Sequence, residues 1–257
     1  MSELPKNRRP VFRPKRMDAC FCNSGKRFKS CCGSNAPKRP PPYGIRVVHN
    51  FLSAQLCDDW VARAELKPRE PLEVVDVKKS SHDSIVLKRD PARVTESVVL
   101  DELEDEFNQK VVQAIHSHIE PYYNHKIAWH ESAILLRYSA GGLYKVHADA
   151  DDFNKEHGVQ VKVLDRDVSL LLYLNDDYIG GGLKFPMFNY RYQPRKGDLV
   201  FFPSDFRYKH EAEKVISGVR YAIVSWSALS NVHRVMSGRP GNSIVLDEDG
   251  IWPSPAD

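Results

Sequence analysis

Two segments of the chain carry residue types that bind transition metals. His147 and Asp149 are separated by one residue. Because successive side chains of an extended strand point to opposite faces, an extended segment 143–149 would put both on one face. A second histidine, His210, follows much later in the chain. Two histidines and one carboxylate form the facial triad that holds non-haem Fe(II) and leaves coordination positions open. The three residues therefore predict an iron site with room for a co-substrate and for oxygen.

A cationic residue follows the second histidine. Arg220 lies ten residues after His210 and opens the apolar segment 220–226, which we expect to form a strand. A guanidinium group presents a rigid fork of donors that can bind a carboxylate through two hydrogen bonds. Arg220 is therefore a candidate partner for a ligand that bears a carboxylate.

Five short motifs follow one another within the segment 133–226, and each is weak alone. In chain order they are His147-Ala148-Asp149, Leu172-Tyr173-Leu174-Asn175, Gly181-Gly182-Leu183-Lys184-Phe185, Pro194-Arg195-Lys196-Gly197-Asp198, and His210 with Arg220. In this order and spacing the segment resembles the prolyl 4-hydroxylase-like subgroup of iron(II)/2-oxoglutarate oxygenases. The resemblance implies a mainly β protein, with a double-stranded β-helix (jelly-roll) core and helices packed on its outside.

The resemblance also assigns chemical roles. It makes His147, Asp149 and His210 the ligands of Fe(II), and it directs Arg220 to the distal carboxylate of 2-oxoglutarate. O2 is the second co-substrate, and ascorbate is a candidate further cofactor. Relatives carry Lys ten residues after the second histidine or Arg nine residues after it, so Arg220 departs from both patterns.

Three aromatic residues are further candidates for this site. The resemblance implies that Tyr173 hydrogen-bonds the same carboxylate as the arginine and that Tyr138 contributes a hydrogen bond nearer the iron. Core packing with a satisfied hydroxyl is the alternative for both tyrosines. Trp226 shares strand parity with Arg220 and is a candidate substrate contact, with a core position as the alternative.

The cysteines are clustered near the N-terminus. Four of the five are Cys20, Cys22, Cys31 and Cys32. With the intervening Ser-Gly, aromatic residues and lysines, the segment 18–34 resembles the SEC-C zinc motif. A piece this short cannot bury a core, so a tetrahedral Zn²⁺ held by four thiolates would have to fold it. Loop cysteines without a metal are the alternative reading, and Cys57 is expected to be a small core residue.

Charge and composition divide the chain. Residues 1–43 hold eleven Lys/Arg and two acids, although the net charge of the whole chain is only +3. A basic segment of this kind suggests a polyanionic partner, RNA or a ribosome, reached through the zinc module; solvation of a flexible terminus is the alternative. We predict a basic flexible tail (1–17), a zinc module (18–34), a Pro-rich linker (35–43), an oxygenase domain (44–230) and an irregular C-terminal tail (231–257).

The lengths of the apolar runs argue against a membrane-spanning segment. The longest, Leu170 to Leu174, is far shorter than the roughly 20 residues of a membrane span. No apolar segment typical of a signal peptide begins the chain. With 42% hydrophobic and 28% charged residues, the composition is that of a globular protein. We therefore expect a cytoplasmic protein with no membrane partner.

Periodicity predicts the elements around the site. Ser53 is a candidate N-cap for a helix that runs to about Glu65, and 100–122 has the apolar spacing of a long amphipathic helix. Apolar runs predict strands at 168–174 and 199–203. The polar excursion 150–167 is interpreted as a lid over the iron, with a surface insertion as the alternative.

The leading functional hypothesis is a dioxygenase that hydroxylates a residue, with proline as the first candidate, in an intracellular protein. The zinc module would serve as its docking piece. A hydroxylase of small molecules or free amino acids is an alternative that uses the same site. A non-catalytic binding protein built on the same β-helix belongs to a different class, and an intact triad together with Arg220 counts against it.

Overall fold

The computed structural model describes residues 8–9, 16–17, 26–31, 41–72, 74–75, 87–88 and 91–251. Three of the four predicted zinc ligands, Cys20, Cys22 and Cys32, lie outside these residues, as do most of the predicted tail, zinc module and linker. Cys31 is described, directly after the short 3-10 helix Phe28–Ser30.

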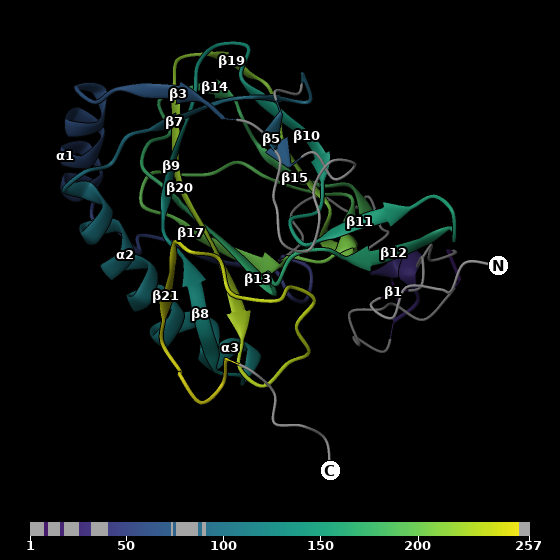
Figure 1. Ribbon diagram of the computed structural model, residues 1–257. Helices are drawn as coiled ribbons and strands as arrows, with labels where there is room; N and C mark the ends of the chain where they lie inside the picture. The colour runs from purple at the N-terminus through teal and green to yellow at the C-terminus, as the bar shows by residue number, and fades with distance from the viewer. Residues whose placement is uncertain are drawn as a thin grey trace.

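A large antiparallel sheet forms the centre of the protein (Figure 1). Its strand order is β2 (Arg46–Val48), β17 (Leu199–Pro203), β13 (Val168–Tyr173), β20 (Arg220–Leu229), β9 (Ile134–Tyr138), β7 (Glu96–Val98) and β3 (Arg69–Pro71). The far end of β20 pairs instead with β8 (Ile127–Glu131), which in turn pairs with β21 (Ser243–Val245). The predicted strands at 168–174 and 199–203 are thus confirmed as neighbours in one sheet.

A smaller sheet faces one side of the large one. Its strand order is β16 (Tyr190–Tyr192), β15 (Leu183–Phe185), β18 (His210–Ala212), β10 (Leu143–His147) and β6 (Arg93–Val94). Buried side chains from both sheets meet in the space between them, for example Phe185 of β15 with Phe202 of β17 at 4.9 Å between ring centroids. Shorter pairs complete the strands: β14 (Ile179–Gly180) with β19 (Val215–Ser217), and β4 (Val74–Val75) with β5 (Leu87–Lys88).

Helices cover the opposite side of the large sheet, at the left of Figure 1. Helix α1 (Ala54–Glu65) begins as predicted at Ser53, whose hydroxyl accepts a hydrogen bond from the backbone N–H of Leu56. Helix α2 (Leu103–Ala114) continues through a π-helical turn (Ile115–Ile119) into α3 (Glu120–Tyr123), which corresponds to the predicted long helix 100–122. Its apolar side chains pack in one core with Leu170 and Leu172 of β13. Among the described residues, no helix is long and apolar enough to cross a membrane.

The alternation of β13 divides the interior in two. Leu170 and Leu172 face the helices, whereas Ser169, Leu171 and Tyr173 point toward the smaller sheet. Strand alternation requires this separation, because neighbouring side chains point to opposite faces. The prediction of a mainly β protein with flanking helices is confirmed, and the two facing sheets are consistent with the predicted jelly roll.

The segment 150–167 contains a β-hairpin. Its strands are β11 (Asp151–Asn154) and β12 (Val159–Lys162), and β1 (Arg8–Arg9) adds a third strand beside β12. The N–H of Val163 donates to the carbonyl of Ala150 at 2.8 Å, which closes the base of the hairpin next to the His-x-Asp motif. The role of this hairpin as a lid stays a prediction.

The C-terminal segment, predicted as an irregular tail, is attached to the domain within residues 231–251. Within 231–251 it contributes strand β21, and Ile251 packs against Trp129. The carboxylate of Asp165 accepts hydrogen bonds from the backbone N–H groups of Val235 and Met236 at 2.9 and 3.0 Å. Regular pairing is confined to β21, which explains why no periodic pattern marks a segment that is nevertheless attached to the domain.

Candidate metal centre

The structure brings His147, Asp149 and His210 together between the two sheets. One ligand atom from each residue lies within 4.8 Å of the other two. Asp149 Oδ1 is 3.4 Å from His147 Nε2, and Asp149 Oδ2 is 3.6 Å from His210 Nε2. Among the described residues, this is the one such group of His, Cys, Asp or Glu side chains.

Strand pairing brings the two imidazoles together. His147 at the end of β10 is the direct partner of His210 at the start of β18. The Nδ1 atom of each ring lies near a backbone carbonyl, that of Lys145 at 2.8 Å and that of Tyr208 at 3.1 Å. A hydrogen bond from Nδ1–H to a carbonyl selects the tautomer in which Nε2 is free to bind a metal.

Asp149 lies outside the strand in which the sequence predicted it. The strand ends at His147, so Asp149 is in the bend that follows rather than in the strand. Its N–H donates to the carbonyl of Ser204, and its carboxylate accepts a hydrogen bond of 2.7 Å from Ser169. The Ser169 hydroxyl also contacts the Ser204 hydroxyl at 2.7 Å. Strand β13 and the residue directly after β17 therefore position this carboxylate.

The protonation states suit a cation. Burial opposes ionisation of the Asp149 carboxyl, but His210, His147 and the Ser169 hydroxyl together outweigh it and hold its pKa well below the ordinary value. Burial, reinforced by His147, lowers the pKa of His210 to about 4. At neutral pH the site thus contains a carboxylate and a neutral buried imidazole. This donor set fits Fe(II), which imidazole and carboxylate ligands bind in a facial arrangement.

We expect Ser169→Ala to weaken metal binding at this site by about 10- to 100-fold, the usual cost of losing a hydrogen bond to a ligating side chain. Titration with Mn(II), followed by electron paramagnetic resonance, measures the affinity without oxidation. Ser227→Ala on β20 is the matched control, because this hydroxyl is also buried but contacts no ligand. Equal affinities in the two variants would contradict a supporting role for Ser169.

Arg220 is buried at the start of β20. Its side chain is 2% exposed, it donates a hydrogen bond of 2.7 Å to the carbonyl of Gly181, and its guanidinium lies 3.9 Å from the ring centroid of Tyr138. Its Nε atom is buried without a partner, and no carboxylate of the described residues pairs with it. An isolated buried charge is costly, so this arrangement fits a ligand that brings its own carboxylate.

The three predicted aromatic residues have different surroundings. Tyr173 is fully buried and its hydroxyl has no partner within the described part of the chain, which leaves a donor for a ligand. Tyr138 presents its ring face to Arg220, a contact that the sequence did not predict. Trp226 packs with Tyr138 in the same apolar cluster, and the guanidinium of Arg166 stacks over its ring at 3.8 Å. Arg166 is itself held by both carboxylate oxygens of Glu131 at 2.5 and 2.6 Å.

Sequence reasoning missed Ser169 and Tyr178. Ser169 lies inside an apolar strand, and its polarity at a position facing the interior was the available signal. Tyr178 follows the turn after Asn175, and its buried hydroxyl has no partner among the described residues. An aromatic residue in a turn gives no such signal, since only the folded chain shows what lies beside it.

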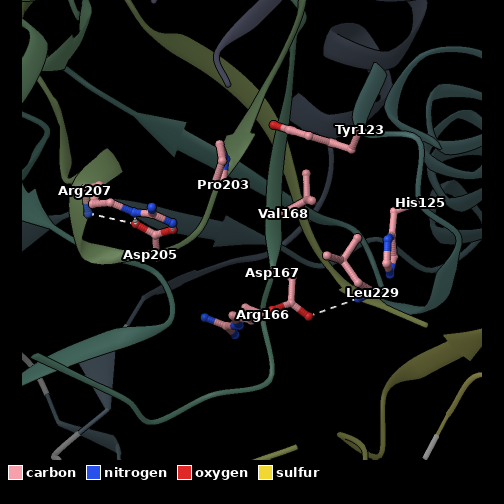
Figure 2. Close-up of a pocket in the computed structure, with 9 residues that line it drawn as sticks. All are labelled: Tyr123, His125, Arg166, Asp167, Val168, Pro203, Asp205, Arg207 and Leu229. Carbon is pink, nitrogen blue, oxygen red and sulfur yellow. Dashed lines mark hydrogen bonds and ion pairs between the residues drawn. The ribbon is translucent and has the colours of Figure 1, made fainter. Parts of the chain in front are cut away.

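A separate pocket lies where β13 begins and β17 ends. Figure 2 shows nine lining residues, among them Asp205 and Arg207, which form an ion pair of 2.6 Å. The other polar side chains that line it are also engaged: Tyr123 donates to the Gly44 carbonyl, and Asp167 accepts from the N–H of Leu229. None of the three triad residues lines this pocket. Its polar side chains are already engaged, His125 with the Ser230 carbonyl and Arg166 with Glu131, so we assign it no chemistry.

Comparisons with known proteins agree with this geometry. Residues 133–228, which contain the triad and Arg220, match the family model described as the 2OG-Fe(II) oxygenase superfamily. Human prolyl 3-hydroxylase 3 is 42% identical over 74 residues, which are 27% of this chain and 10% of that protein. The chain thus spans about a tenth of the length of this curated relative.

Solved structures with a similar outline include two prolyl hydroxylases. The viral collagen prolyl hydroxylase of Paramecium Bursaria Chlorella virus-1 matches with a TM-score of 0.49 and 20% identity, over 72% of this chain and 96% of that one. A Pseudomonas putida prolyl-4-hydroxylase matches with a TM-score of 0.48 and 19% identity, over 72% and 92%. The family match and the geometry of the triad together support a 2-oxoglutarate-dependent dioxygenase domain that includes residues 133–228, a class that uses Fe(II), 2-oxoglutarate and O2.

Proposed function

We propose that the protein hydroxylates a residue, proline first among the candidates, in an intracellular protein substrate. The observation that carries the proposal is a complete facial set of donors, His147, Asp149 and His210, in the same domain as a buried arginine without a carboxylate partner. The 42% identity with human prolyl 3-hydroxylase 3 over 74 residues supports proline as the target.

In this proposal the three ligands hold Fe(II) on one face, and the Arg220 guanidinium binds the distal carboxylate of 2-oxoglutarate. When bound, iron with this co-substrate and O2 supplies hydroxylation of a C–H bond, with release of succinate and CO2. The residues of the chain orient the reactants. The serine pair holds the Asp149 carboxylate, and Tyr173 offers a hydroxyl to the co-substrate. The charges and positions of these side chains are thus set before the reactants bind.

The substrate class can be tested in cell lysate. Protein loaded with Fe(II) is incubated with 2-oxoglutarate and lysate proteins, and peptides are then searched by mass spectrometry for the gain of one oxygen atom. We expect oxygen to be added to proline residues, and the addition should disappear when 2-oxoglutarate is withheld. Oxygen on free amino acids or other metabolites alone would favour the small-molecule hydroxylase. Absence of succinate with every substrate source would favour the non-catalytic binding protein.

We further propose that Cys20, Cys22, Cys31 and Cys32 hold a structural Zn²⁺ and that this module docks the enzyme on its partner. The described part of the module supports contact with the domain, because Phe28 and Cys31 pack against the apolar cluster between the sheets. The basic residues around the module favour RNA or a ribosome as that partner.

Elemental analysis tests the zinc assignment. We expect about one Zn²⁺ per chain, lost in a Cys20→Ser, Cys22→Ser double variant because thiolate ligands supply the binding free energy. Cys57→Ala is the control, since this thiol is buried on helix α1 in the core of the domain and lies apart from the module. Unchanged zinc content in the double variant would remove the assignment.

A further inference from the structure

A second tyrosine hydroxyl lies near Arg220 in addition to Tyr173. The Tyr178 side chain is 7% exposed and packs in the apolar cluster that contains Tyr138 and Trp226. Its ring lies against Gly181, close enough that a Cβ on that glycine would be 2.9 Å from Cε2 of the ring. The carbonyl of the same glycine accepts the hydrogen bond from Arg220 Nη1. One residue therefore contacts both the ring and the guanidinium, and this keeps the two side chains close.

Three donors in this region lack an acceptor. The Nε atom of Arg220 and the hydroxyls of Tyr173 and Tyr178 are all buried, and none has a partner among the described residues. Leaving a buried donor unpaired costs free energy, and most such groups in folded proteins are satisfied. One carboxylate offers about four acceptor positions on two oxygens, so a single carboxylate could satisfy all three donors.

The tyrosine hydroxyls are in the protonated form that donates. Burial raises the pKa of Tyr178 to about 12, and the positive charge of Arg220 opposes that rise. Burial likewise raises the pKa of Tyr173 far above its ordinary value, again against the charge of Arg220. In both cases the opposing contribution of Arg220 places its charge near the tyrosine concerned.

We propose that Tyr178 is a binding residue for the co-substrate: its hydroxyl donates to the distal carboxylate of 2-oxoglutarate, alongside Arg220. The inference rests on the proposed function, because it concerns the same co-substrate pocket. Three donors on one carboxylate would make the site selective for 2-oxo acids with a second carboxylate. A ligand without that group would leave all three donors buried and unpaired, a situation that sites of this kind discriminate against strongly.

Tyr178→Phe tests the proposal, because it removes the hydroxyl and keeps the ring. Isothermal titration calorimetry of the Mn(II)-loaded protein measures affinity without turnover. We expect the variant to bind 2-oxoglutarate at least about ten-fold more weakly than the wild type, as a lost hydrogen bond to a charged group predicts. Affinity for 2-oxopentanoate, which has the same chain length but no distal carboxylate, should stay unchanged. Tyr123→Phe is the control, since that partly buried hydroxyl donates to the Gly44 carbonyl, away from the proposed co-substrate site.

The melting temperature of the variant is a second measurement. A structural role of the hydroxyl would lower it, whereas a role in binding the co-substrate would not. Without 2-oxoglutarate, Tyr178→Phe should melt at or above the wild-type temperature, because it removes an unpaired buried hydroxyl. A lower melting temperature would mean that the hydroxyl has a structural partner, and it would overturn the proposal. Equal 2-oxoglutarate affinities in variant and wild type would also overturn it. Failure of the wild type itself to bind 2-oxoglutarate would instead remove the co-substrate assignment on which the inference rests.

Discussion

Replacing His147 with alanine is expected to reduce succinate formation from 2-oxoglutarate by more than about 100-fold, beyond the cost of losing a group that only supports a ligand. The imidazole contributes one of three donors, and its Nε2 atom lies 3.4 Å from the Asp149 carboxylate. Without it, two donors remain from opposite strands and no facial set exists. Succinate measured by mass spectrometry, together with bound iron measured by elemental analysis, should fall in parallel.

His116→Ala is the matched control for this experiment. His116 is exposed on the π-helical turn, where it pairs with Glu120 at 3.0 Å, and it lies on the helical side of the large sheet. We expect its loss to leave both succinate and iron at wild-type values. Full turnover in His147→Ala would contradict the triad as the iron site, and so would an equal loss in both variants.

Replacing Arg220 with methionine should weaken 2-oxoglutarate binding by about 30-fold or more, because removing one partner of a buried charge pair costs about 2–5 kcal/mol. Methionine has a comparable length and no charge. In the absence of 2-oxoglutarate we expect the variant to be at least as stable as the wild type, since burying an unpaired guanidinium is unfavourable. Calorimetric titration and thermal melting, each with and without the co-substrate, measure the two effects.

Arg137→Met is the matched control, which shows whether the loss of any arginine on this sheet weakens 2-oxoglutarate binding. Arg137 lies on the neighbouring strand β9, but it is paired with Glu96 at 2.8 Å and hydrogen-bonded to Tyr221 at 2.8 Å. Its replacement should lower the melting temperature and leave 2-oxoglutarate affinity unchanged, which is the reverse of the pattern for Arg220. If Arg220→Met instead lost stability and kept its affinity, the guanidinium would have a structural role.

Local sequence was sufficient for the elements that carry a strong pattern. Ser53 and the apolar spacing after residue 100 predicted both helices, because capping and periodicity are properties of neighbouring residues. The π-helical turn in the second helix was not predicted from the sequence. The alternation of His147 and Asp149 predicted one shared face, although the strand ends between them.

Site residues that belong to a sequence motif could be predicted, whereas those that strand pairing brings together could not. His147 and His210 could be joined from sequence only because the order of motifs resembles a family, and their contact depends on the pairing of β10 with β18. The Ser169–Ser204 pair has no motif, because its two residues meet across β13 and β17. Tyr178 also belongs to no motif. It became a candidate because its buried hydroxyl has no hydrogen-bond partner among the described residues, which a sequence cannot show.

The attachment of residues 231–251 has a practical consequence for shortening this protein. Ending the chain at residue 230, where sequence composition suggests a boundary, would remove the neighbour of β8 and expose Trp129. It would also leave the Asp165 carboxylate without the two N–H groups that now cap it, directly before the arginine that stacks on Trp226. A truncated enzyme of this kind would carry an unprotected sheet edge, and such edges promote aggregation. A shortened chain should therefore retain residues 231–251.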